Sequence, residues 1–166
     1  MLQGTSDKHK DYVFGQMTTR GIIDGSDEYA IRTVRDTRYR LVWNLNYDVP
    51  FSNVCVTSDY FDSMKAKAAS GDATAKTFTS RYIHRPEYEL FDCETDPLEM
   101  TNLADSEAHQ EVLARLKAEL VAWMENQGDQ GVATERDAIF RLQRNRNKPR
   151  EQVLREWEQR SARSKR

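Results

Sequence analysis

Two hydroxyl side chains and a guanidinium stand next to one another between two glycines. Thr18 and Thr19 directly precede Arg20. The planar fork of an arginine donates two parallel hydrogen bonds to a sulfate or carboxylate, and threonine hydroxyls can bind sugar oxygens. This spacing predicts that Thr18, Thr19 and Arg20 bind an anionic substrate. The alternative, which the residues leave open, is that Arg20 pairs with Asp24 or Asp27 and only orders the loop.

Oxygen-bearing side chains gather in Asp92-Cys93-Glu94-Thr95-Asp96, as ligands do in a calcium-binding loop. The EF-hand pattern would require a glycine at Pro97 and a glutamate at Leu103, and neither is present. A strand end followed by a helix cap is therefore the favoured interpretation. The histidines are far apart and lack the spacing of a zinc site: His9, His84 and His109. With no nucleophile elbow or phosphate-binding glycine loop, the sequence predicts no catalytic residue and no metal ligand in this chain.

The end of the chain is strongly basic. Residues 132–166 hold eleven Lys and Arg against five Asp and Glu, a net charge of +6, whereas the whole chain carries −2. These cations could neutralise a sulfated polysaccharide or phosphates: Arg141, Arg144, Arg146, Lys148 and Arg150. A solvated helix is the other interpretation, and we do not expect nucleic acid because only Phe140 and Trp157 interleave with the charges. A free-standing polyanion-binding adaptor is thus an alternative function.

The elements that must position these groups form an α+β domain. Alternating apolar residues predict an antiparallel sheet of about four strands, beginning near Tyr12, Glu28, Tyr39 and Tyr88. The first strand should end at Gly15. A helix over Asp105–Gln127, stopped by Gly128, should lie across the sheet, and shorter helices are expected at residues 58–69 and 72–82. Arginines line the polar side of the central hairpin, where cross-strand ion pairs are favoured over an anion site: Arg32, Arg35, Arg38 and Arg40.

Between the last strand and the long helix, the residues match a helix start signal. Asp96 offers an N-cap carboxylate, Pro97 fits the first helical position and Glu99 stands at the third, which is a capping box. The pattern predicts one helical turn here. A second start signal follows at Asp105, which we expect to cap the long helix.

Five segments, taken in order, resemble a known family. They are Tyr12-Val13-Phe14-Gly15, Thr18-Thr19-Arg20-Gly21, Ile31–Asp36, Tyr39–Asn46 and the stretch from Leu90-Phe91-Asp92 to Asn102-Leu103-Ala104. This order is similar to the closing part of the sulfatases, nearest to the heparan N-sulfatases (sulfamidases). The resemblance implies a C-terminal subdomain at residues 12–131, preceded by a linker at 1–11 and followed by the basic tail at 132–166.

In such enzymes this subdomain packs on a catalytic domain and helps to wall the substrate pocket. The resemblance implies a parent that hydrolyses sulfate esters or sulfamates of glycans such as N-sulfoglucosamine in glycosaminoglycans, using formylglycine and calcium. Neither Cys55 nor Cys93 lies in the Cys/Ser-x-Pro/Ala-x-Arg motif from which formylglycine is made. We therefore expect this chain to be non-catalytic by itself.

The expected partners are the catalytic domain and, through the parent, a sulfated glycan. Separation of the two domains would expose apolar surface, so self-association is expected, with Tyr12, Phe14 and Trp43 as candidates. No run of about 18 apolar residues exists, and the first residues hold no apolar signal-peptide core. The resemblance implies that the parent is exported to the periplasm or the extracellular space.

Overall fold

The computed structural model of the chain describes residues 10–19, 24–26 and 28–164. Their contacts divide them into two compact units. The first unit holds the described residues up to Met17, together with Ile31–Asn44 and Glu87–Gln130. The second holds the described residues of Thr18–Ala30, Leu45–Pro86 and Gly131–Arg166. The fold is α+β, as the sequence predicts, while the predicted domain limits at residues 11 and 131 stay a prediction.

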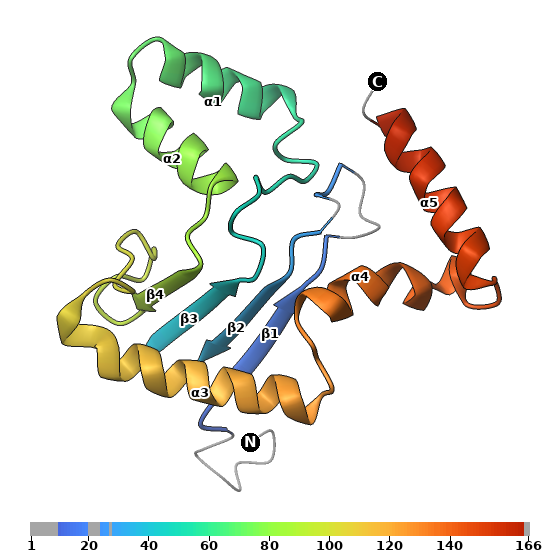
Figure 1. Cartoon of the computed structure of the whole chain (residues 1–166). Coiled ribbons are helices and arrows are strands. Elements are labelled where there is room, and N and C mark those ends of the chain that lie inside the picture. Colours follow the sequence, from blue (N-terminus) through green and yellow to red (C-terminus); the bar gives the residue numbers. More distant parts are fainter. Residues whose placement is uncertain (1–9, 20–23, 27, 165–166) are drawn as a thin grey trace, which may run out of the picture. The chain divides into compact units, whose positions relative to one another are not determined.

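The first unit is built on a four-stranded antiparallel sheet in the order β1-β2-β3-β4 (Figure 1). The strands are β1 (Val13–Met17), β2 (Ile31–Arg35), β3 (Tyr39–Asn44) and β4 (Tyr88–Asp92). All four predicted strands are present. Two limits differ from the prediction, because β1 continues through Gly15 and β2 begins at Ile31 rather than near Glu28.

The core of this unit lies between one face of the sheet and α3 (Gln110–Asn126), which crosses the strands (Figure 1). The register aligns Phe14, Val34, Leu41 and Leu90 across the sheet, so their side chains share that face. The side chains at the centre of this core are fully buried: Val34, Leu41, Leu90, Leu116 and Leu120. Phe14 stacks on Trp123 of α3, with ring centroids 5.1 Å apart.

Three aromatic residues expected on an exposed surface face α3 instead. Besides the stack of Phe14, the hydroxyl of Tyr12 accepts a hydrogen bond from Arg115, and Trp43 stacks on Tyr88 beneath the ammonium of Lys117. All three are half-buried, and self-association of the chain stays a prediction. Apolar exposure on β1 occurs at Val13 (63%) and Met17 (37%), at positions that alternate with Phe14.

The two ends of α3 agree with the prediction to different degrees. A 3₁₀ turn over Glu107–His109 precedes the helix, and Ser106, not Asp105, is the residue before that turn. The stop at Gly128 is confirmed. Gly128 has a φ of +66°, its N–H donates to the carbonyl of Glu125, and the N–H of Asp129 donates to the carbonyl of Met124. This is a Schellman motif, which satisfies the last carbonyl groups of the helix.

The predicted capping box after β4 is wrong. Asp96 instead accepts a hydrogen bond from the N–H of Thr101 (2.8 Å), and Glu99 adopts a left-handed φ of +55°. The carboxylate of Glu99 forms an ion pair with Arg40 on β3. The segment is therefore a turn without a helix. The carboxylate of Glu99 pairs with Arg40 of β3 and does not cap the local backbone.

The outer edge of β4 is covered by a side chain. Asn102 accepts hydrogen bonds from the N–H groups of Leu90 (2.8 Å) and Ala104 (3.0 Å), and its amide donates to the carbonyl of Tyr88 (3.0 Å). The N–H of Leu103 donates to the carbonyl of Leu90 (2.8 Å). The amide of Asn102 thus takes the place of a neighbouring strand.

The second unit contains α1 (Asp59–Ala69) and α2 (Ala73–Ile83), which pack together as a hairpin. Ser58 and Asp72 cap them, at the predicted starts of the two helices. Phe78 of α2 is 40% exposed, whereas Thr79 is buried. An aromatic cluster forms the core, with ring centroids 5.1–5.7 Å apart: Tyr29, Phe51, Phe61 and Tyr82.

The basic tail is helical but not in one piece. It consists of α4 (Val132–Arg141), a 3₁₀ turn η2 (Gln143–Asn145) and α5 (Arg150–Ser164). The first break comes at Leu142, which is extended with a ψ of 136° and ends α4. Within the described residues, no helix is both long enough and apolar enough to cross a membrane.

Candidate functional site

The predicted anion-binding residues have different surroundings. Thr18 is exposed, whereas Thr19 is only 2% exposed. The N–H of Thr19 donates to Oε1 of Glu135 (2.9 Å), and its hydroxyl donates to the carbonyl of Tyr29 (3.5 Å). Arg20 and its alternative partner Asp27 lie outside the described residues. Thr19 therefore fixes the backbone beside Arg20, and the exposed hydroxyl belongs to Thr18.

Glu135 is the residue of this site that the sequence did not reveal. It lies in α4 and is 1% exposed, one helical turn before the fully buried Ile139. A buried carboxylate needs hydrogen-bond donors, and the N–H of Thr19 is one of them. The i, i+4 spacing to Ile139 was a signal that Glu135 shares a buried face, but the excess of cations around it indicated a solvated helix.

The far side of the same loop is also held. The N–H of Ser52 donates to the hydroxyl of Ser26 (2.7 Å), and the N–H of Ser26 donates to the carbonyl of Ser52 (3.1 Å). The hydroxyl of Ser52 donates to the carbonyl of Asp24 (2.9 Å). The carboxylate of Asp24 accepts a hydrogen bond from the hydroxyl of Thr57 (3.2 Å). The described residues on both sides of 20–23 are thus anchored by hydrogen bonds.

The arginines of the central hairpin mostly form ion pairs, the interpretation favoured from the sequence. Arg32 pairs with Asp129, Arg38 with Asp92 and Arg40 with Glu99. Arg32 differs from the expectation, because its side chain is buried (3% exposed) rather than solvated. The fourth, Arg35, is exposed, and it lies directly opposite Arg40 in the pairing of β2 with β3.

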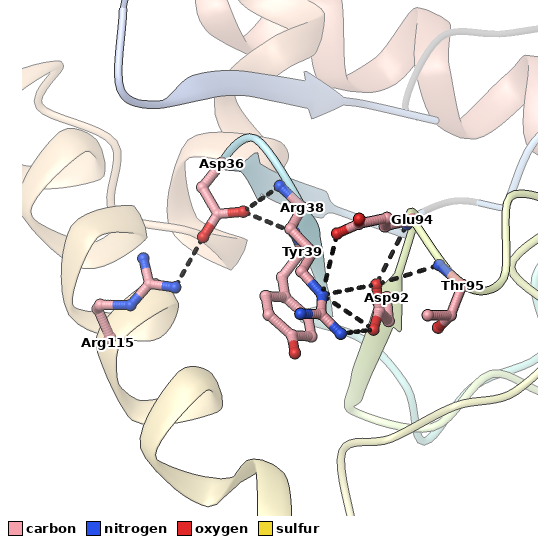
Figure 2. A network of polar contacts seen from close by, with 7 residues as sticks. All are labelled: Asp36, Arg38, Tyr39, Asp92, Glu94, Thr95 and Arg115. Carbon is pink, nitrogen blue, oxygen red and sulfur yellow. Dashed lines mark hydrogen bonds and ion pairs between the residues drawn. The ribbon is translucent and has the colours of Figure 1, made fainter.

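Figure 2 shows how Asp36 closes the turn between β2 and β3. Its Oδ1 accepts hydrogen bonds from the N–H groups of Arg38 (2.8 Å) and Tyr39 (2.6 Å), and its Oδ2 accepts from Arg115 of α3 (2.7 Å). Burial raises the pKa of Asp36, but these hydrogen bonds outweigh it and the pKa is lowered overall. The carboxylate joins the hairpin to the helix.

Asp92 plays the matching role at the end of β4 (Figure 2). Arg38 binds its carboxylate through Nε (3.1 Å) and Nη2 (2.6 Å), and the N–H groups of Glu94 and Thr95 donate to Oδ1 (3.1 and 3.4 Å). The side-chain hydrogen bonds from Arg38 hold the pKa of Asp92 well below its usual range, and the same pair raises the pKa of Arg38. With both oxygens bonded to protein donors, Asp92 is a structural ion pair rather than an acid or base.

The two cysteines are free thiols in half-buried positions. Burial raises the pKa of Cys93, and Glu99 adds to the rise against the opposing charge of Arg35. A raised pKa keeps Cys93 protonated and poorly nucleophilic at neutral pH. In the part of the chain that the structure describes, no group of three or more His, Cys, Asp or Glu residues is arranged to hold a metal ion.

Three proteins of known activity are similar to this chain. Two are ulvan-active sulfatases of Formosa agariphila, one 30% identical over 132 residues and the other 31% identical over 119. These alignments cover 78% and 68% of the chain but only 24% and 20% of the relatives. The third is the human N-sulphoglucosamine sulphohydrolase, 32% identical over 98 residues, which are 57% of the chain and 20% of that protein. The chain thus spans about a quarter or less of the length of these relatives.

Among solved structures, a candidate sulfatase from Bacteroides thetaiotaomicron is similar over 75% of this chain and 18% of its own. The TM-score is 0.44 and the sequence identity is 19%. No protein-family model matches the chain.

Proposed function

Because the homologues of this chain are sulfatases, we propose that it is the C-terminal structural and substrate-pocket module of a sulfatase acting on glycans. The observation that carries the proposal is the mismatch in coverage. One ulvan-active sulfatase matches 78% of the chain with 24% of its own length. This coverage supports a segment of a larger sulfatase, whose remaining part would hold the catalytic centre.

The same relatives support the proposed substrate class. Their names refer to ulvan and to N-sulphoglucosamine. We propose that the parent hydrolyses sulfate esters or sulfamates of such glycans, with an N-sulfoglucosamine-like unit as the first candidate. The parent would be exported, since glycans of this kind are extracellular polymers.

The hydrolytic chemistry would come from a formylglycine and a calcium ion. The residues of this chain do not fit either group, since neither Cys55 nor Cys93 stands in a Cys-x-Pro-x-Arg motif and both oxygens of Asp92 are bonded to protein donors. We therefore place both groups in the remainder of the parent. In this proposal the chain supports the catalytic domain and contributes to the pocket wall.

The loop before β2 is our candidate for the pocket wall. The hydrogen bond from Thr19 to Glu135 fixes the backbone at the residue before Arg20, and the exposed Thr18 adds a hydroxyl. A fixed backbone lowers the entropy lost when a long side chain binds its ligand. Thr18 and Arg20 would then contact the sulfated sugar, while Thr19 holds them in place.

Kinetics of the full-length parent test this assignment. Arg20→Ala should raise KM for a sulfated glucosamine with little change in melting temperature, because a guanidinium fork that binds the sulfate contributes to substrate binding rather than to folding. Arg155→Ala, which removes an exposed arginine of the same unit, is the matched control. An unchanged KM with a lowered melting temperature would make Arg20 a structural residue and refute its role.

Assays on the 166-residue chain test the non-catalytic role. We expect no hydrolysis of aryl sulfates or N-sulfoglucosamine, with or without added calcium. Turnover that persists through further purification steps would overturn this part of the proposal.

A further inference from the structure

The basic tail carries more arginines than its carboxylates neutralise. Residues 141–160 hold seven Lys and Arg against three Glu. Three of the cations form ion pairs: Lys148 with Glu156 (2.5 Å), Arg150 with Asp137 (2.9 Å) and Arg155 with Glu151 (3.9 Å). The other four have no carboxylate within ion-pair distance among the described residues: Arg141, Arg144, Arg146 and Arg160.

Two of these four arginines meet at one place. Arg144 of η2 and Arg160 of α5 line a shallow open cleft together with Asn145, Val153, Glu156 and Trp157. Val153 is 2% exposed and forms the apolar floor, and the indole of Trp157 is half-buried beside it. The cleft is therefore lined by two arginines and one tryptophan.

The other polar groups of the cleft are already occupied. The carboxylate of Glu156 accepts hydrogen bonds from Nζ of Lys148 (2.5 Å) and Nε2 of Gln152 (2.9 Å). Arg160 also attracts this carboxylate, without reaching ion-pair distance. The amide of Asn145 donates to the carbonyl of Ile139 (2.7 Å), which fixes η2 against α4. Arg144 and Arg160 form no ion pair at contact distance with the described carboxylates, so their guanidinium groups can donate to a ligand.

We propose that this cleft binds a sulfate group of a glycan chain, with Arg144 and Arg160 contacting the sulfate and Trp157 contacting the sugar ring. Arginine suits an oxyanion because its fork donates two parallel hydrogen bonds, and an indole face packs on the apolar side of a sugar. A single-stranded nucleic acid would use several successive aromatic residues, whereas this cleft has one. The choice of a sulfated ligand rests on the proposed function; the anion site itself rests on the geometry alone.

Binding of a heparin hexasaccharide to the complete 166-residue chain tests the proposal by calorimetry. Chemically desulfated hexasaccharide and the oligonucleotide (dT)₆ are the competing probes, all at the same ionic strength. We expect binding of the sulfated hexasaccharide only. Affinity should fall as salt is added, because binding releases counterions from both partners.

Three single variants, each of which removes one positive charge, locate the site. Arg144→Gln and Arg160→Gln should each weaken binding about three- to fivefold, as expected for the loss of one exposed ion pair, and the double variant about tenfold or more. Arg155→Gln, on the same helix as Arg160 but paired with Glu151, should bind as tightly as the unsubstituted 166-residue chain. Far-UV circular dichroism of each variant verifies that the helices are intact.

Several results would overturn the proposal. An equal loss in Arg155→Gln would mean diffuse attraction by the whole tail, and equal binding of desulfated hexasaccharide would remove the sulfate contact. Tighter binding of (dT)₆ would make the cleft a nucleic-acid site. Hydrolysis is not measured here, so a sulfatase assignment that fails in the parent would leave these results unaffected.

Discussion

The buried ion pair between Arg32 and Asp129 should make the first unit sensitive to the loss of either partner. Both side chains are less than 5% exposed. Arg32 on β2 also donates from Nη2 to Oδ1 of Asp129 (3.1 Å) and from Nη1 to the carbonyl of Ile31 (3.0 Å). Asp129 directly follows Gly128, so the pair fastens the C-terminal end of α3 to the sheet.

Removing one partner should be far more costly than removing both. Asp129→Ala would leave a guanidinium buried without its counter-charge, which costs about 3–5 kcal/mol. This is a large share of the roughly 5–15 kcal/mol by which proteins of this kind are stable. The double variant Arg32→Met/Asp129→Leu leaves no buried charge, so it should recover most of the loss.

Urea unfolding followed by tryptophan fluorescence measures the effect in the first unit alone. Trp43 and Trp123 belong to that unit, and a Trp157→Phe background removes the third tryptophan. With an m-value of about 2 kcal/mol/M, Asp129→Ala should lower the urea midpoint by about 2 M. Arg155→Ala, which breaks an exposed pair, should change the free energy of unfolding by less than about 1 kcal/mol.

Two outcomes would refute this reasoning. A loss below about 1 kcal/mol in Asp129→Ala would mean that water or another group compensates Arg32. A double variant no more stable than the single variant would mean that packing, and not the unpaired charge, sets the cost.

Three further predictions concern other hydrogen bonds of the chain. Asn102→Ala should lower the free energy of unfolding by about 1–2 kcal/mol, and Asn102→Asp by less because it keeps the acceptor for Leu90; urea unfolding tests both. The pKa of Asp92 is lowered, so its contribution to stability is present above its unfolded pKa of about 3.9 and is lost as the pH falls below that value. Asp92→Asn should accordingly be less stable at pH 7 and show a flatter acid dependence in melting scans, and an unchanged slope would contradict this. The N–H of Thr19 should exchange slowly by NMR, about tenfold faster in Glu135→Ala but little changed in Glu135→Gln; equal rates in the two variants would exclude the carboxylate as its acceptor.

Much of the fold could be predicted because its signals are local. Alternating side chains indicated the strands, Ser58 and Asp72 cap the helices that follow them, and Gly128 ends α3 with a positive φ. Each of these signals acts within a few residues, so it can be recognised without knowing what lies nearby in space. The strand limits were less accurate, since pairing with a neighbour extends β1 past Gly15.

The failures have a common physical cause. Asp96, Pro97 and Glu99 match a capping box, but Arg40, 59 residues earlier, attracts the carboxylate of Glu99 and the helical turn does not form. At the candidate site, the sequence drew attention to residues 18–20 but not to Glu135, which is 116 residues from Thr19. Contacts over such separations depend on the complete fold and leave little trace in the local pattern.

The side chain of Asn102 also limits how the sheet can assemble with copies of itself. It occupies the hydrogen-bonding groups of Tyr88 and Leu90, so a strand from another molecule finds no free partner at that edge of β4. In the described sheet, β1 is the other outer strand. Two chains joined through β1 would present a closed β4 edge at each end. Such a sheet can form a pair, but it cannot grow into a fibre.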